Sequence, residues 1–393
     1  MVPTIPPSAT PSPLPPTATL APTATLIPSS TPIPTATVPS YPIQGLGPAN
    51  FPAGVNPLTG IEVADPKILE RRPLVIKVEN LPREHRPQSG LSLADIVYEY
   101  YTEQGSTRFA SIFYGTDAER VGPIRSARFF DVQVVQMFKG VFVFGSAYSA
   151  VWNRLVNSDF GFRLVVENPY SCPALCRFEP KGRDLLVADT RAMNAYLAQA
   201  GINNIRPNLD GMFFQMTPPE GGQPAGSVYL RYSGAIYNRW DYDPSSNRYL
   251  RFSETQNDVN RNNEVYAQLT DQLTAKPIAA DTLVTVCIPH SYYENTPTMD
   301  VVDILPLPSS GPVVSCDGKQ YPGGTGPAYV ARDGKVYPVT WKREKKEDLL
   351  TLVGADGKPF PFKPGQTWFE VMGASSTVEQ KDNSIKFTFK IAP

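Results

Sequence analysis

The stretch RRPLVIKVENLPREHRPQSGLSLADIVYEYYTEQGSTRF, residues 71–109, decides how the rest of the chain is interpreted. Its first part, residues 73–80, is dense enough in apolar side chains to predict a strand in the interior of a sheet, yet it includes Lys77 and Glu79. Burying a charge is costly unless the charge is paired or used. Functional residues are therefore expected in and directly after this stretch.

The sequence DIVYEYYTE, which begins at Asp95, predicts a second strand. Because side chains alternate along a strand, Asp95, Glu99 and Glu103 share one face. The turn QGS leads to a returning strand, and a four-residue loop would place Glu103 opposite Arg108. The three carboxylates are candidate catalytic groups for acid–base chemistry. The alternative is that they only pair with Arg108 and stabilise the strands.

The segment VGPIRSAR, residues 121–128, leads into a predicted helix over residues 127–139. Ser126 is a favourable N-cap for this helix. Free amides and partial positive charge at a helix N-terminus favour anions. The sequence thus predicts a site for phosphate, sulfate or carboxylate. The alternative is a structural ion network with the acidic strand face. The predicted ligand-binding residues are Arg108, Arg125, Ser126, Arg128 and Asp131.

The other patterns predict a spacer followed by two folded domains. Residues 1–48 are an uncharged, Pro/Thr-rich tract that we expect to be a disordered stalk, since recurring proline breaks helices. Strands interleaved with helices predict an α/β (α+β) sandwich over 49–218, with a short helix capped by Thr190 and a last strand over 210–216. Short strands with turn signals predict a mostly β domain over 227–393.

Charge and cysteine content restrict the class of function. A formal net charge of -1 gives no bulk reason to bind nucleic acid or an anionic membrane. The cysteines Cys172, Cys176, Cys287 and Cys316 fit disulfides in an oxidising compartment, and we expect Cys287 and Cys316 to pair. No second Cys or His pair stands at zinc-like spacing, so neither a metal nor a cofactor is expected. His85, in a polar loop without a nucleophile motif, is expected to be solvated.

These stretches, together with NPLTG (56–60), RWDYDPSSNRYLRF (239–252) and GADGKPFPFKPGQTWFEV (354–371), resemble the YerB-like lipoprotein family. The resemblance covers residues 56–375. It implies two domains and an extracytoplasmic, membrane-tethered or secreted protein of a bacterial envelope, and the function of the family is not established. No cysteine precedes Cys172, so we expect contact with the membrane only through a tether missing from this chain.

Two functions follow as hypotheses. The first is a binding module for an anionic envelope component, such as a cell-wall glycopolymer or a partner protein, because no nucleophile, metal or cofactor motif is recognisable. The second is an envelope enzyme acting on glycan or phosphoryl-lipid substrates, because the charge pattern is loosely similar to that of the LytR-CpsA-Psr phosphotransferases. Convergence of the charged residues on an open cleft would favour a ligand or substrate, whereas closure on each other would favour a structural role.

Overall fold

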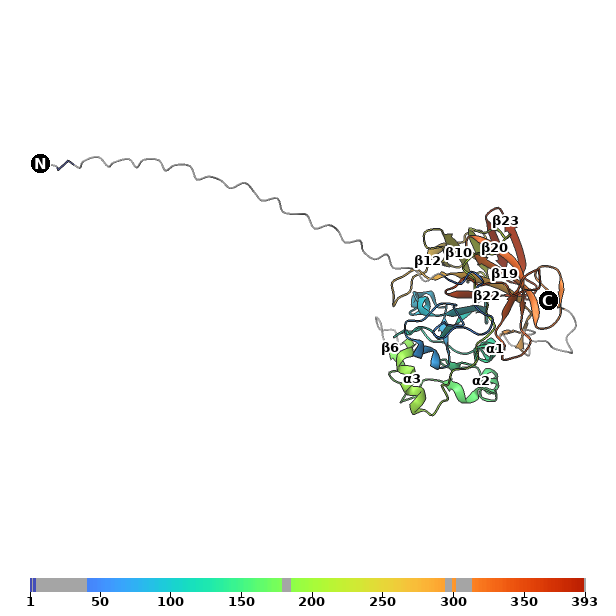
Figure 1. Ribbon diagram of the computed structural model, residues 1–393, viewed down its shortest axis with the longest axis horizontal. Coiled ribbons are helices and arrows are strands. Elements are labelled where there is room, and N and C mark those ends of the chain that lie inside the picture. The colour runs from blue at the N-terminus through green and yellow to red at the C-terminus, as the bar shows by residue number, and fades with distance from the viewer. Residues whose placement is uncertain (2, 5–40, 179–184, 294–298, 302–312, 392–393) are drawn as a thin grey trace. The chain divides into compact units, whose positions relative to one another are not determined.

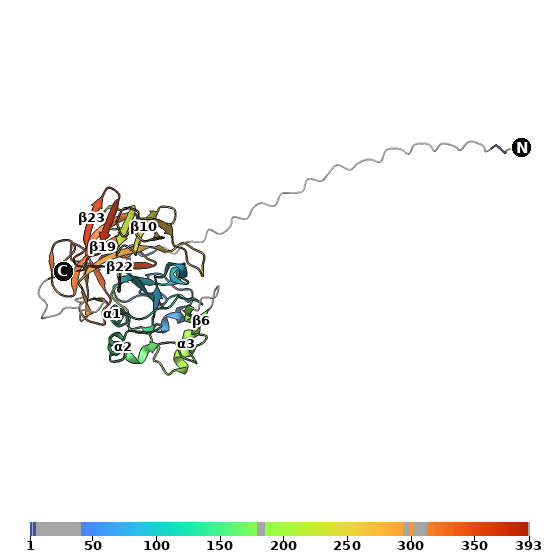
Figure 2. The same cartoon turned by 180° about the vertical axis from the view of Figure 1, so that it is seen from behind.

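Two β-sheets and three short α-helices form the framework of the described part of the chain, as the computed structural model in Figures 1 and 2 shows. Tyr41–Pro393 forms one compact unit. In both views the helices gather in the blue-to-green half of this unit, and the orange and red half is built of strands. The structure describes residues 1, 3–4, 41–178, 185–293, 299–301 and 313–391. Most of the predicted stalk, residues 1–48, lies outside these described ranges.

The larger sheet has eleven strands, and its order places a block of strands from the C-terminal half beside a block from the N-terminal half. The predicted hairpin is β2 (Ile96–Tyr101) and β3 (Thr107–Phe113), with β1 (Leu74–Glu79) on the other side of β3. On its free side, β2 pairs in parallel with β22 (Thr367–Gly373), which comes from the C-terminal half. The remaining strands of this sheet are β4 (Val141–Val143), β5 (Leu164–Val165), β8 (Gln223–Pro224), β14 (Thr282–Ile288), β19 (Thr325–Arg332), β20 (Lys335–Lys342) and β21 (Thr351–Val353).

The smaller sheet has seven strands, all from the C-terminal half. Together with the helices of the N-terminal half, it confirms an α+β part followed by a mostly β part. Its strands are β9 (Ser227–Arg231), β10 (Tyr237–Asp243), β11 (Arg248–Glu254), β12 (Tyr266–Gln268), β13 (Ala279–Ala280), β23 (Thr377–Lys381) and β24 (Ser384–Thr388). Three strand pairs stand apart: β6 (Leu175–Phe178) with β7 (Leu185–Ala188), β15 (His290–Tyr292) with β16 (Met299–Val301), and β17 (Val313–Val314) with β18 (Gln320–Tyr321).

The two faces of the larger sheet are covered by different neighbours, and β2 shows both. Tyr98 packs edge-on against Phe130 and Phe138 of the first helix, with ring centroids 6.0 and 6.1 Å away. On the opposite face, Trp368 of β22 meets Trp240 of the smaller sheet at 5.0 Å. Residues of odd number on β2 therefore face the smaller sheet. The helices are α1 (Phe129–Phe138), α2 (Ser149–Val156) and α3 (Thr190–Gln199), with 3-10 turns at Pro66–Glu70, Arg83–His85, Leu91–Leu93 and Gly161–Arg163.

The predicted register of the hairpin is wrong. Tyr100, not Glu103, lies opposite Arg108, and Glu103 belongs to the turn. Gln104 and Gly105 both have positive φ, 49° and 76°, and the Ser106 amide donates to the Glu103 carbonyl. This tight turn lengthens the loop to five residues and removes Glu103 from the strand.

Three further predictions of local structure are also wrong. The cap of α1 is Arg128 rather than Ser126, because the Arg128 amide donates to the carboxylate of Asp131 at 2.6 Å. The cap of α3 is Asp189 rather than Thr190, because the Asp189 carboxylate accepts from two amides of the first turn. Residues 210–216 form no strand, since only isolated bridges at Phe214 connect them to neighbouring segments.

Candidate functional site

Glu99, one of the candidate catalytic carboxylates, lies in a fully buried charge cluster between the two sheets. Arg251 Nη2 on β11 donates to Glu99 Oε2 at 2.7 Å, and Arg251 Nη1 donates to Glu370 Oε1 at 3.1 Å. Glu370 lies on β22, directly beside Glu99 in the register of the larger sheet. All three side chains are 0% exposed. We call Glu99, Arg251 and Glu370 the inter-sheet triad.

Every carboxylate oxygen of the inter-sheet triad accepts a hydrogen bond. Glu99 Oε1 accepts from an amide and a hydroxyl of the N-terminal half. Glu370 accepts from Trp240 Nε1 and from the Tyr232 hydroxyl, both at 2.9 Å. Burial raises the pKa of Glu370 to about 8, and the nearby charge of Glu99 adds to the rise. A cluster so closed and dry has the properties of a structural ion network.

Asp95 is held separately, at the start of β2. Its carboxylate accepts hydrogen bonds from the amides of Tyr114, at 2.5 Å, and Gly115, at 3.1 Å, and from Asn56 Nδ2 at 2.7 Å. Burial raises the pKa of Asp95 to about 6, although these hydrogen bonds oppose the rise. Asp95 lines a cavity of about 500 Å³, but its oxygens are already occupied by the protein.

Glu103 binds two of the predicted ligand-binding arginines. Arg128 Nε donates to Glu103 Oε2 at 2.5 Å, a second Arg128 nitrogen binds the other oxygen, and Arg108 Nη2 lies 3.7 Å from Oε1. Burial alone would raise the pKa of Glu103, but the hydrogen bonds and charge of Arg128 outweigh it, and the pKa falls below its ordinary value. Arg128 is only 14% exposed and Arg108 only 8%. The donors of Arg128 are therefore mostly used within the protein, and Arg108, although its Nε lacks a hydrogen-bond partner, is largely closed to a ligand by burial.

Asp131 closes the N-terminus of α1 from inside. Its side chain is 0% exposed, accepts from the Arg128 amide, and lies 3.1 Å from Lys77 Nζ on β1. The Tyr100 hydroxyl also donates to this carboxylate. Burial lowers the pKa of Lys77 to about 7, while the charge of Asp131 raises it in part. Asp131 therefore supplies the negative charge that the sequence pattern assigned to a ligand at this helix start.

Arg125 and Ser126 are the two predicted residues that remain open. They line a cavity of about 220 Å³, which also contains Glu79, His85 and Ser146. The Arg125 side chain is 48% exposed, and its Nε lies 3.0 Å from Glu79 Oε2. The Ser126 and Ser146 hydroxyls are hydrogen-bonded to each other at 2.7 Å. We call this space the Arg125 cavity.

Glu79 fixes the positions of Arg125 and His85 in the Arg125 cavity. One of its oxygens binds Arg125, and the other lies 2.5 Å from His85 Nδ1. Glu79 is only 3% exposed, and burial raises its pKa, which His85 and Arg125 partly offset. The carboxylate therefore orients both side chains while the guanidinium of Arg125 stays accessible to a ligand.

Glu79 and His85 were not predicted from the sequence as site residues. Glu79 carried a signal, because it stands at the end of a strand whose six residues are all buried. For His85 there was no comparable signal, only its position in a loop six residues after Glu79. Contact between the two depends on how the loop folds back, which the local pattern does not reveal. Of the candidate catalytic residues, neither Asp95, Glu99 nor Glu103 lines the Arg125 cavity.

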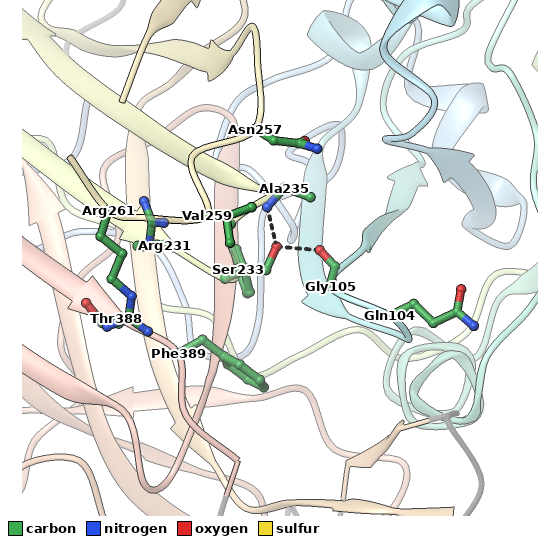
Figure 3. A pocket seen from close by; sticks show the side chains of 12 residues that line it. Gln104, Gly105, Arg231, Ser233, Ala235, Asn257, Val259, Arg261, Thr388 and Phe389 are labelled. Atoms are coloured by element: carbon green, nitrogen blue, oxygen red, sulfur yellow. Dashed lines mark hydrogen bonds between the residues drawn. The ribbon is translucent and has the colours of Figure 1, made fainter. Parts of the chain in front are cut away.

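A second polar cavity, of about 290 Å³, lies where the β2–β3 turn meets the smaller sheet (Figure 3). Arg231 is neutralised there by Asp258 at 2.9 Å and by Glu264 at 2.8 Å. Ser233 donates to the Gly105 carbonyl and accepts from the Ala235 amide, as the dashed lines in Figure 3 mark. Its central polar groups thus satisfy one another, and the exposed Arg261 lies at the edge.

The described part of the chain holds no cluster of three or more His, Cys, Asp or Glu residues arranged to bind a metal ion. Nor does any helix in that part have the length and apolar character needed to cross a membrane. Disulfides join Cys287 to Cys316 and Cys172 to Cys176. Bonds of this kind persist in oxidising compartments outside the cytosol.

Comparisons with known proteins agree with the two-part organisation. Residues 58–167 match the "Protein of unknown function (DUF3048) N-terminal domain", and residues 228–369 match the C-terminal domain of the same family. The chain is 26% identical over 332 residues to "Putative lipoprotein YerB" of Bacillus subtilis, covering 80% of this chain and 85% of that protein. A crystal structure of the YerB protein from Bacillus subtilis has the same fold, with a TM-score of 0.62 at 24% identity over 81% of this chain and 97% of that one.

The chain belongs to the DUF3048 family, as matches to both of its domains show. The resemblance seen in the sequence is thereby confirmed. The two disulfides and the similarity to a lipoprotein indicate an extracytoplasmic location.

Proposed function

We propose that this DUF3048 protein is a binding module that holds an anionic group of an envelope component in the Arg125 cavity. The observation that carries the proposal is the accessibility of Arg125. Its side chain is 48% exposed beside a cavity, whereas Arg108 and Arg128 are 8% and 14% exposed and face Glu103. A guanidinium group oriented by a buried carboxylate is well suited to phosphate and carboxylate, because its planar donors match both.

The hydroxyls of Ser126 and Ser146 add neutral donors next to Arg125. Both line the same cavity and bind each other at 2.7 Å, so either hydroxyl can turn toward a ligand oxygen. Glu79 is already bound to the guanidinium of Arg125 and to the ring of His85, which reduces its repulsion of an anion. These contacts support a compact anionic group as the ligand.

The partner class follows from the location. An extracytoplasmic protein with a Pro/Thr-rich N-terminal tract would hold its folded part away from a surface, as a membrane-tethered or secreted protein. The anionic groups within its reach belong to cell-wall glycopolymers or to envelope proteins. We place glycopolymers first, because an exposed arginine beside two hydroxyls suits repeated phosphate or carboxylate groups.

The test is a titration of the full chain with solubilised wall glycopolymer, comparing wild type, Arg125→Ala and Arg261→Ala. Arg261 is the matched control, since it is an exposed arginine at the edge of a different cavity. We expect Arg125→Ala to weaken binding at least 10-fold and Arg261→Ala to change it less than 2-fold. Equal affinities of wild type and Arg125→Ala would refute binding at this site.

The contact between His85 and Glu79 favours a second candidate, hydrolysis of an envelope glycan or phosphoryl-lipid in the same cavity. A carboxylate at Nδ1 fixes the tautomer of a histidine and leaves its Nε2 available for proton transfer. Incubation of wall polymer and of lipid diphosphate with wild type and His85→Gln tests this role. Product release by wild type that is lost in the variant would support hydrolysis, and equal release would exclude His85 as the base.

A further inference from the structure

Another cavity, of about 240 Å³, which is distinct from the cavity of Figure 3, adjoins the Arg125 cavity. The two share His85, Pro123 and Leu185 as a common wall. This adjoining cavity is also lined by Arg120 and Phe178, and we call it the Arg120 cavity. The side chain of His85 thus stands between two neighbouring spaces, each with two arginines in its lining.

The guanidinium group of Arg120 stacks on an aromatic ring. Its guanidinium carbon lies 4.1 Å above the centroid of Phe178, and the side chain is partly exposed. Within the described residues, Arg120 has neither an ion pair nor a hydrogen bond from its side chain. Stacking on an aromatic face fixes the plane of a guanidinium and leaves its N–H groups at the edge free.

The backbone sets the spacing of the two arginines. Residues 121–124 run along β7: Val121 exchanges both backbone hydrogen bonds with Ala188, and the Ile124 amide donates to the Leu186 carbonyl at 2.8 Å. Arg120 and Arg125 therefore stand at the two ends of a short segment anchored on a strand pair. Five residues span at most about 18 Å, so one ligand chain can reach both arginines.

We propose that the Arg120 and Arg125 cavities form one two-part site for a linear polymer that carries anionic groups at regular intervals. One acidic group binds Arg125 beside the serine hydroxyls, and the next binds Arg120 on the far side of His85. This inference rests on the proposed function, because it assigns the first acidic group to the Arg125 cavity. Phosphodiester and carboxylate groups share the required chemistry, and both occur in envelope glycopolymers.

One charge in the Arg120 cavity acts against an anion. Glu84 is exposed in the lining of this cavity, whereas Arg86, also in the lining, is bound to Glu254 at 2.8 Å. Arg86 is therefore already neutralised, and Arg120 is the cation left for the ligand. Removing the charge of Glu84 should strengthen binding of a polymer without affecting a ligand that fills only the Arg125 cavity.

The experiment compares single and linked acidic groups on the full chain by calorimetric titration. The probes are glycerol phosphate, an oligomer of glycerol phosphate joined by phosphodiesters, and an oligogalacturonate for the carboxylate case. Joining two groups that bind neighbouring sites raises affinity by roughly 100-fold or more, because the second contact becomes intramolecular. We expect this gain for at least one oligomer, and the oligomer that shows it identifies the acid.

Variants test whether the gain in oligomer affinity comes from the Arg120 cavity. Arg120→Ala should remove at least 10-fold of the oligomer affinity and change glycerol phosphate affinity less than 2-fold, whereas Glu84→Gln should increase only oligomer affinity. Arg261→Ala, at the cavity of Figure 3, is the control and should change neither. Thermal unfolding of each variant checks that the fold is intact.

The outcomes separate the two proposals. An oligomer preference that Arg120→Ala leaves unchanged, or the absence of any oligomer preference, would overturn the two-part site and leave the Arg125 proposal standing. Binding of every probe that is insensitive to Arg125→Ala would overturn both. A loss in Arg120→Ala that Arg120→Lys restores only in part would support stacking on Phe178 in addition to charge.

Discussion

The inter-sheet triad and the Arg125 cavity contain the same kinds of groups but have opposite surroundings. Each pairs an arginine with a buried glutamate on a strand of the larger sheet. Arg251 is 0% exposed and bound on two sides, whereas Arg125 is 48% exposed and bound on one. The difference teaches that a charge in a buried strand leaves room for a ligand only where its partner still faces an open space.

Removal of Arg251 should have the largest effect of any single change in this comparison. In Arg251→Met, Glu99 and Glu370 stay buried without their cation, and breaking a buried pair in this way costs about 3–5 kcal/mol. We expect the free energy of unfolding, measured in urea, to fall by that amount, with no change in the slope against denaturant. A loss below 1 kcal/mol would show that the triad is less dry than the structure indicates.

The triad should also make stability depend on pH. Burial raises the pKa of Glu370 to about 8, so between about pH 4.5 and 8 the folded state holds a proton that the unfolded state has released. Its contribution is therefore fully present below that window and is lost as pH rises through it, at up to about 1.4 kcal/mol per pH unit.

The variant that isolates this effect is Glu370→Gln, which keeps the shape but cannot ionise. Stability measured at pH 5, 6.5 and 8 should fall less steeply in Glu370→Gln than in wild type. Asp95, with a pKa raised to about 6, titrates in both proteins and cancels in the difference. Identical slopes would mean that Glu370 is ionised throughout this range.

Local patterns predicted the elements that carry these charges but not the charges' partners. β1 and the β2–β3 hairpin were predictable because their apolar density and turn residues are properties of short segments. The partners of Glu99 were not, because Arg251 lies 152 positions away and reaches it only when the sheets pack. The parallel pairing of β22 with β2, which joins the two halves in one sheet, has the same origin.

The sequence also did not separate Arg125 from Arg128, although the two have opposite environments. Both arginines belong to the motif VGPIRSAR, and both lie at the start of the same helix. Arg128 is closed because the turn after β2 brings Glu103 onto it, and that turn depends on positive φ at Gln104 and Gly105. Arg125 stays open because, among the described residues, its ion pair is with Glu79 alone and its side chain is 48% exposed. Differences of this kind come from tertiary contacts that no window of sequence contains.

Salt should affect the two regions differently. Mobile ions screen exposed charges over about 10 Å at 0.1 M salt, and screen buried pairs much less. Raising the salt concentration from 50 to 500 mM should therefore weaken ligand binding at Arg125 several-fold. The difference in stability between wild type and Arg251→Met should stay within about 0.5 kcal/mol over the same range. A stability difference that shrinks with salt would indicate that ions reach the triad.

The smallest expected effect is that of Arg125→Met on stability, and it decides between the two interpretations of this arginine. If Arg125 belonged to a structural ion network, its loss would resemble that of Arg251. Because it is half exposed and Glu79 keeps its contact with His85, we expect the free energy of unfolding to change by less than about 0.5 kcal/mol. The same urea titrations as for Arg251→Met measure it. A loss above 2 kcal/mol would assign Arg125 to the scaffold, and the Arg125 cavity would then lose the accessible cation on which ligand binding depends.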